Sequence, residues 1–146
     1  MMEFIVTLPL LYIHLTAIAC TLALVVTADI HGFLWLVGKI GTLPKKRMRR
    51  IHLLIWIGLS IIIVSGFCMF LTYKDYLLVL PAFKLKMFFV ATLLINAFVI
   101  GKLAHIAYFK PFSALPASKR TPLLVSGFVS TMSWIGALIA AQFLGL

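Results

Sequence analysis

Four histidines and one aspartate hold most of the chemistry that this sequence could perform. His14 lies among leucine, isoleucine and alanine residues early in a long apolar run, and Asp29 and His31 lie near its end. An ionisable side chain at membrane depth is costly, so by default it is a functional hypothesis. Histidine is also a usual axial ligand of haem iron. His14 is therefore the first candidate for a cofactor ligand.

The four histidines fall at two depths. A helix rises 1.5 Å per residue, so His14 and His31 lie about 25 Å apart along one continuous helix. These two residues therefore cannot ligate one metal ion. His52 and His105 each lie at the same end of a predicted helix as His31. Two of these three residues could clamp a second haem iron from facing helices.

Simpler roles for the histidines stay open. His14 could hydrogen-bond a neighbouring helix, or act in a proton relay, without touching a cofactor. Histidines at a membrane interface beside basic residues are commonly amphipathic anchors, a description that applies to His31, His52 and His105. Asp29 is expected to pair with a basic residue, and the nearest candidates along the chain are Lys39, Arg49 and Arg50.

The third apolar segment adds further polar candidates. Lys86, near its start, could neutralise a haem propionate or a substrate carboxylate, although a lysine there commonly only reaches toward the headgroups. Asn96 and His105 are nine residues apart, on opposite sides of a helix. Because His105 lies beside Gly101 and Ala97, we expect it to face inward.

The composition indicates an integral membrane protein that presents these residues from helices. Of 146 residues, 64% are hydrophobic, and the mean hydropathy is +1.18. A spanning helix needs about 20 apolar residues, and long unbroken apolar runs favour helices over a barrel. The predicted fold class is an all-α, four-helix transmembrane bundle forming one domain, 1–146. Its helices are expected at about 4–39, 51–73, 82–107 and 122–146.

Glycine and proline residues at helix ends, together with a stripe of small residues, refine this prediction. Gly41 and Pro44 are expected to end the first helix after Lys39, and Pro122 fits the first turn of the last helix. Small residues recur at helical spacing along that last helix, so this stripe should face the bundle interior. The stripe consists of Ser126, Ser130, Ser133, Ala137 and Ala140.

The charge distribution predicts the orientation. The net charge is +10, and most basic residues lie in two segments between apolar runs, 39–50 and 102–120. Such segments face the cytoplasm, so both termini are expected outside and His14 in the outer half of the membrane. We expect membrane lipid as a partner and no nucleic acid. The expected location is a bacterial inner (plasma) membrane.

One resemblance adds to these arguments. His14 in the first apolar segment, with Phe83, Lys86 and Met87 opening the third, form a pattern that resembles the HemJ-type protoporphyrinogen oxidase and CopD-like group of small four-helix membrane proteins. The resemblance implies a haem b with His14 as an axial ligand. The chain departs from the group where Asp29 stands in place of the usual arginine, and its last loop lacks the acidic motif of the oxidase. The resemblance therefore does not indicate protoporphyrinogen oxidation specifically.

Three functional hypotheses follow. The leading one is a protein that binds one or two haem b groups, has a redox or electron-transfer role, and takes a porphyrin or quinone as partner. The second is a non-enzymatic structural or assembly subunit of a larger membrane complex or homo-oligomer. The third is copper handling through His14 with Met69 or Met87.

Overall fold

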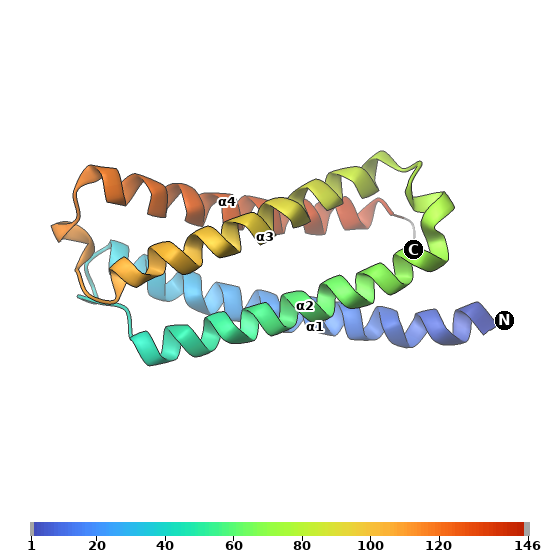
Figure 1. Ribbon diagram of the computed structural model, residues 1–146, viewed down its shortest axis with the longest axis horizontal. Helices are drawn as coiled ribbons and strands as arrows, with labels where there is room; N and C mark the ends of the chain where they lie inside the picture. The colour runs from blue at the N-terminus through green and yellow to red at the C-terminus, as the bar shows by residue number, and fades with distance from the viewer. Residues whose placement is uncertain (1, 145–146) are drawn as a thin grey trace. The chain divides into compact units, whose positions relative to one another are not determined.

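The computed structural model describes the backbone of residues 2–144 and the side chains of residues 8–144. The described chain is helical, without β-strands, and this confirms the predicted all-α, four-helix class (Figure 1). The elements in chain order are α1 (Met2–Leu36), α2 (Lys45–Leu77), α3 (Pro81–Ala107), the short 3-10 helix η1 (Phe112–Ala114) and α4 (Ala117–Gln142).

Four of these helices are long and apolar enough to cross a membrane. Their candidate spans are Leu8–Leu36, Lys45–Leu77, Pro81–Ala107 and Ala117–Gln142. The protein is therefore a multi-pass integral membrane protein. α4 ends at Gln142, before the expected end at Leu146, since the backbone of Phe143 is no longer helical. Leu146 itself lies outside the described residues, and the sidedness of the termini stays a prediction.

Contacts along the chain group it into two compact units. The first unit contains α1 as far as Gly32 together with Pro44–Lys74, so it is an antiparallel pair of α1 and α2. The second unit contains Phe33–Leu43 and the chain from Asp75 onward, and its main helices are the antiparallel pair α3 and α4. A single domain spanning 1–146 stays a prediction.

Gly38 ends α1, three residues earlier along the chain than the expected stop at Gly41. The backbone of Gly38 has φ 75°, a left-handed conformation that costs glycine little. Its N–H donates to the Trp35 carbonyl at 3.1 Å, and the N–H of Lys39 donates to the Leu34 carbonyl at 2.9 Å. This pair of bonds is a Schellman motif, which satisfies carbonyls left open at a helix end. The helix therefore stops at Leu36 rather than at Lys39.

Two other helix starts differ from the expected ones. α2 begins at Lys45 rather than at residue 51, because lysine, arginine and methionine are good helix formers. α4 begins at Ala117, so Pro122 lies inside the helix, beyond its first turn. The expectation that Pro122 occupies the first turn is therefore wrong.

The second unit has a polar contact at its centre. Asn96 Nδ2 donates to the Ser126 carbonyl at 2.8 Å, and Ser126 Oγ donates to Asn96 Oδ1 at 2.8 Å. Ten residues after Ser126 on α4, a Cβ placed on Gly136 would collide with the Phe89 ring, so α3 and α4 approach closely there. The predicted stripe on α4 is confirmed: Ser126, Ser130, Ser133 and Ala140 are buried, and Ala137 is half-buried.

Candidate functional site

His14 is buried in the first unit, where it contacts α2. Only 5% of its surface is exposed, and its Nδ1 atom lies 2.9 Å from Ser65 Oγ. A Cβ placed on Gly66 would lie 3.1 Å from His14 Cε1. The absence of a side chain at Gly66 therefore makes room for the imidazole. The contact joins residues 51 positions apart in the sequence.

The Ser65 hydroxyl determines the tautomer of His14. Ser65 Oγ lies 2.6 Å from the Ile61 carbonyl oxygen, an atom that can only accept, so the hydroxyl proton points there. Toward His14 the Ser65 oxygen must then act as acceptor, so Nδ1 carries the imidazole proton. The lone pair consequently lies on Nε2, which is itself buried. A fixed Nδ1–H donor is the arrangement that histidine ligands of metals commonly show.

α1 and α2 stay in close contact for two turns beyond this hydrogen bond. Thr21 lies seven residues after His14 on α1, and Gly58 lies seven residues before Ser65 on α2. A Cβ on Gly58 would collide with the Thr21 side chain, whose exposed fraction is 1%. Thr21 Oγ1 donates to the Ala17 carbonyl at 2.7 Å. The small residue and the internally bonded threonine allow the two helices to pack at short distance.

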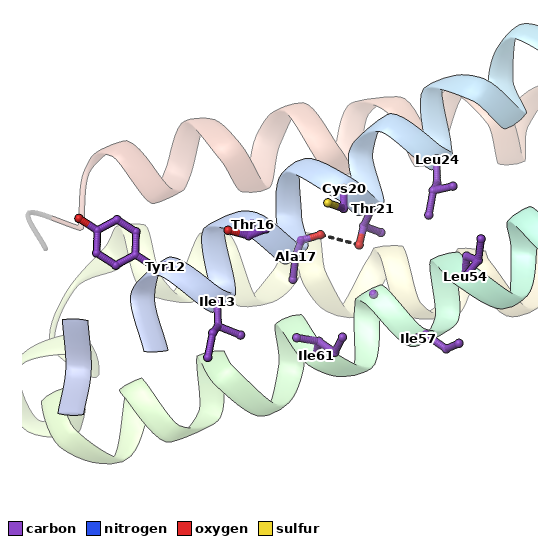
Figure 2. A pocket seen from close by; sticks show the side chains of 11 residues that line it. Tyr12, Ile13, Thr16, Ala17, Cys20, Thr21, Leu24, Leu54, Ile57 and Ile61 are labelled. Atoms are coloured by element: carbon purple, nitrogen blue, oxygen red, sulfur yellow. Dashed lines mark hydrogen bonds between the residues drawn. The ribbon is translucent and has the colours of Figure 1, made fainter. Parts of the chain in front are cut away.

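An apolar groove lies along this helix pair (Figure 2). Its volume is about 530 Å³, within the range of small-molecule pockets. Side chains of both helices line it: Tyr12, Ile13, Thr16, Ala17, Cys20, Thr21, Leu24, Leu54, Ile57, Gly58 and Ile61. His14 is not among the lining residues, although its neighbour Ile13 is. The groove and the His14 ring are therefore adjacent features of one unit rather than one shared cavity.

His31 resembles His14 in one respect. Its Nδ1 atom lies 2.7 Å from the Thr27 carbonyl oxygen, which can only accept, so Nδ1 carries a proton and Nε2 is the lone-pair nitrogen of the neutral ring. The His31 side chain is half-buried. Seventeen residues of α1 separate it from His14, which is about 25 Å along the axis. The two imidazoles are thus independent candidates, as the spacing predicts.

His52 uses its Nε2 lone pair within its own helix. Trp56 Nε1 donates to His52 Nε2 at 3.2 Å, and the two rings meet edge to face with centroids 6.4 Å apart. Iron ligation through Nε2 would have to replace this hydrogen bond. A second haem at His52 stays a prediction, and its binding would cost the hydrogen bond from Trp56.

The prediction that His105 faces inward is wrong. His105 and Gly101 are exposed, whereas Asn96 is buried against α4. Nine residues place His105 opposite Asn96 on the helix, so the side that buries Asn96 turns His105 outward. Its ring instead contacts Phe109, with centroids 5.1 Å apart. Its role as a second haem ligand stays a prediction.

The remaining sequence candidates are placed as follows. Lys86 is half-buried on α3 in the second unit, and its role toward a propionate stays a prediction. Asp29 is exposed and forms no ion pair with Arg49 or Arg50 among the residues that the structure describes. The same residues include no group of three or more His, Cys, Asp or Glu side chains placed to hold a metal ion.

The sequence only weakly indicates that Ser65 and Gly66 belong to the surroundings of His14. Ser65 and Gly66 indicate only a small-residue position that favours close helix approach. Nothing in their spacing relates them to His14, because that relation depends on how α2 is rotated against α1. Thr21 likewise follows an ordinary apolar pattern and is recognised only through its contact with Gly58.

Comparisons with models of protein families, with curated proteins and with solved structures found no match to this chain. The class that the fold defines is a four-helix, multi-pass integral membrane protein.

Proposed function

We propose that this protein is a haem b-binding membrane protein with a redox role, in which His14 is an axial ligand of the iron. The observation that supports this proposal is the His14–Ser65 hydrogen bond, which holds the imidazole with its proton on Nδ1 and its lone pair on Nε2. Iron binds the imidazole nitrogen that carries the lone pair, and in this tautomer that nitrogen is Nε2. On the resemblance described above, we place the protein in a bacterial plasma membrane.

The residues around His14 would support one axial position. Ser65 would fix the plane of the ring and, by accepting a hydrogen bond from Nδ1–H, raise the basicity of Nε2. Haem b, when bound, supplies one-electron redox chemistry. The chain's own contribution is the apolar span around His14, which excludes water, and the serine that orients the ligand.

The test is the absorption spectrum of the purified full-length protein, expressed with haem supplementation and recorded in the oxidised and reduced states. We expect a Soret band that shifts on reduction and about one haem b per chain by the pyridine haemochrome assay. A monodisperse preparation that lacks a Soret band under these conditions would overturn the proposal.

Two variants assign the ligand. His14→Ala should abolish or strongly shift the Soret band of the haem that it holds, whereas His31→Ala, which removes an imidazole with the same Nδ1–H geometry about 25 Å away, should leave that haem bound. Equal spectra for wild type and His14→Ala would remove His14 from the ligand set. Size-exclusion elution at the wild-type volume checks that each variant is folded.

A second candidate function is a structural subunit of a membrane complex, in which His14 only joins helices. The same hydrogen bond supports it, because the contact to Ser65 links α1 to α2 whether or not iron is present. Purification in mild detergent distinguishes the two functions. A colourless protein that elutes with a stoichiometric partner would favour the subunit, and a pigmented protein without a partner would favour the haem protein.

A further inference from the structure

The first two turns of α2 carry five basic side chains in six residues. They are Lys45, Lys46, Arg47, Arg49 and Arg50, and all five are exposed. The other side of the same turns faces the protein, because Met48 is half-buried and Ile51 is 8% exposed. Successive residues advance by 100° around a helix, so the five cations cover a little more than half of its circumference. We call this surface, Lys45–Arg50, the cationic face.

The cationic face lies at the start of a membrane span. α2 continues from Arg50 into Ile51, and no charged residue follows until Lys74. Six residues of helix are about 9 Å long, and the polar headgroup layer on each side of a bilayer is about 5–8 Å thick. The cations therefore occupy a length of helix that matches the headgroup layer next to the apolar span.

Among the residues that the structure describes, four of the five cations of this face have no anionic partner. The first turn of α2 has no acidic residue, although the positive end of a helix favours acids there. In the part of the chain that the structure describes, no hydrogen bond or ion pair occupies the side chains of Lys46, Arg47, Arg49 or Arg50. Arg120 on α4 differs: its Nη2 donates to the Ser113 carbonyl at 2.7 Å, and its guanidinium lies over Phe112.

We propose that the cationic face binds the headgroups of anionic phospholipids. Charge complementarity requires an anionic partner, and the continuity with the apolar span places that partner in the membrane surface rather than in solution. Clusters of four to eight Lys and Arg residues beside a membrane span are known to attract anionic lipid. The proposal is independent of haem, because none of these residues belongs to the His14 environment.

The test is lipid titration of the full-length protein in detergent, followed by native mass spectrometry. Dioleoylphosphatidylglycerol and dioleoylphosphatidylcholine differ in headgroup charge and share their acyl chains. We expect the anionic lipid to bind more tightly. The variant Lys46→Gln/Arg47→Gln/Arg50→Gln should lose at least about fivefold in that preference, the factor expected from even one basic residue at an anionic surface.

A matched control removes the same charge elsewhere. Lys102, Lys110 and Lys119 are also exposed, and they lie in the other segment that is predicted to be cytoplasmic. Lys102→Gln/Lys110→Gln/Lys119→Gln should keep the lipid preference. The variant Arg47→Lys/Arg50→Lys should keep it as well, since it conserves the charge. An equal loss in the Lys102 triple variant would show an effect of net charge alone and would overturn the proposal.

A soluble polyanion is the competing partner, and it is tested separately. The protein in nanodiscs of pure phosphatidylcholine is titrated with a short single-stranded oligonucleotide. We expect no binding that depends on Lys46, Arg47 and Arg50. Oligonucleotide binding that the first triple variant abolishes, together with no preference for the anionic lipid, would assign the surface to a soluble polyanion instead.

Discussion

Ser65 Oγ accepts a hydrogen bond from His14 Nδ1–H because its own hydroxyl proton already points to the Ile61 carbonyl. The relationship makes one serine responsible for both the orientation and the tautomer of a buried imidazole. It also joins two helices inside the membrane span, where a polar group without a partner is costly. The hydrogen bond therefore has a structural consequence and a chemical one, and the two can be separated.

Replacing Ser65 with alanine should destabilise the packing of α1 against α2. If the protein binds haem, the change should also lower its affinity for haem. The His14 Nδ1–H loses its acceptor in a buried place, which costs about 1–3 kcal/mol. Loss of an outer partner of a metal ligand commonly lowers affinity by about 10–100-fold. Thermal unfolding followed by circular dichroism and haem titration measure the two effects. Ser60→Ala is the matched control, because Ser60 also bonds the carbonyl four residues earlier but is exposed. Equal effects of the two changes would contradict the assigned role of Ser65.

Gly58→Ala should destabilise the first unit by about 1–3 kcal/mol, the usual cost of overfilling a packed contact. The added methyl group would collide with Thr21, which is β-branched, buried and bonded to its own helix, so it cannot turn away cheaply. Gly127→Ala is the control, since nothing lies within 4 Å of its Cβ position, and alanine is the better helix former there. The midpoint of thermal unfolding in detergent should fall for the first variant and hold or rise for the second.

The number and type of the elements could be predicted, but several of their ends could not. Runs of about 20 apolar residues identify spanning helices whatever their neighbours are. The start of α2 is not predicted because the charge of Lys45–Arg50 places this segment between apolar runs, although its residues favour helix. The end of α1 depends on Gly38, one of two glycines close together, and the chain conformation decides which of them takes the left-handed position.

In the candidate site, too, some features could be predicted from the sequence and others could not. The apolar neighbours of His14 predict a buried depth, and the structure buries it. Its partner Ser65 could not be predicted, because the rotation of α2 against α1 depends on packing such as that of Thr21 against Gly58. The small neighbours of His105 favour an inward orientation in the sequence, and this prediction is wrong. The burial of Asn96 on the opposite side decides the orientation of α3, since an amide inside a membrane span needs hydrogen-bond partners.

Asn96→Ala should destabilise the α3–α4 pair more than Ser126→Ala does. Asn96 makes both hydrogen bonds of the contact, whereas the alanine variant of Ser126 keeps the backbone carbonyl that accepts one of them. A double-mutant cycle should give a coupling of about 0.6–1.7 kcal/mol, from the average to the largest value found for such bonds between membrane helices. Thr92→Ala is the control, because Thr92 is only half-buried and its hydroxyl bonds only the Phe88 carbonyl of its own helix. A coupling near zero would show that the two side chains act independently.

Gly38→Ala should cost about 1–2 kcal/mol, because an L-residue with a side chain is strained in the left-handed conformation that Gly38 adopts at φ 75°. Gly38→Asn should cost less, since asparagine is the other residue that ends helices in this conformation. Gly41→Ala is the control: Gly41 has no positive φ, and nothing lies within 4 Å of its Cβ position. Thermal unfolding of the three variants in one detergent should rank them Gly41→Ala, Gly38→Asn, Gly38→Ala, from most to least stable. If Gly38→Ala is as stable as Gly41→Ala, the Schellman motif does not hold the end of α1.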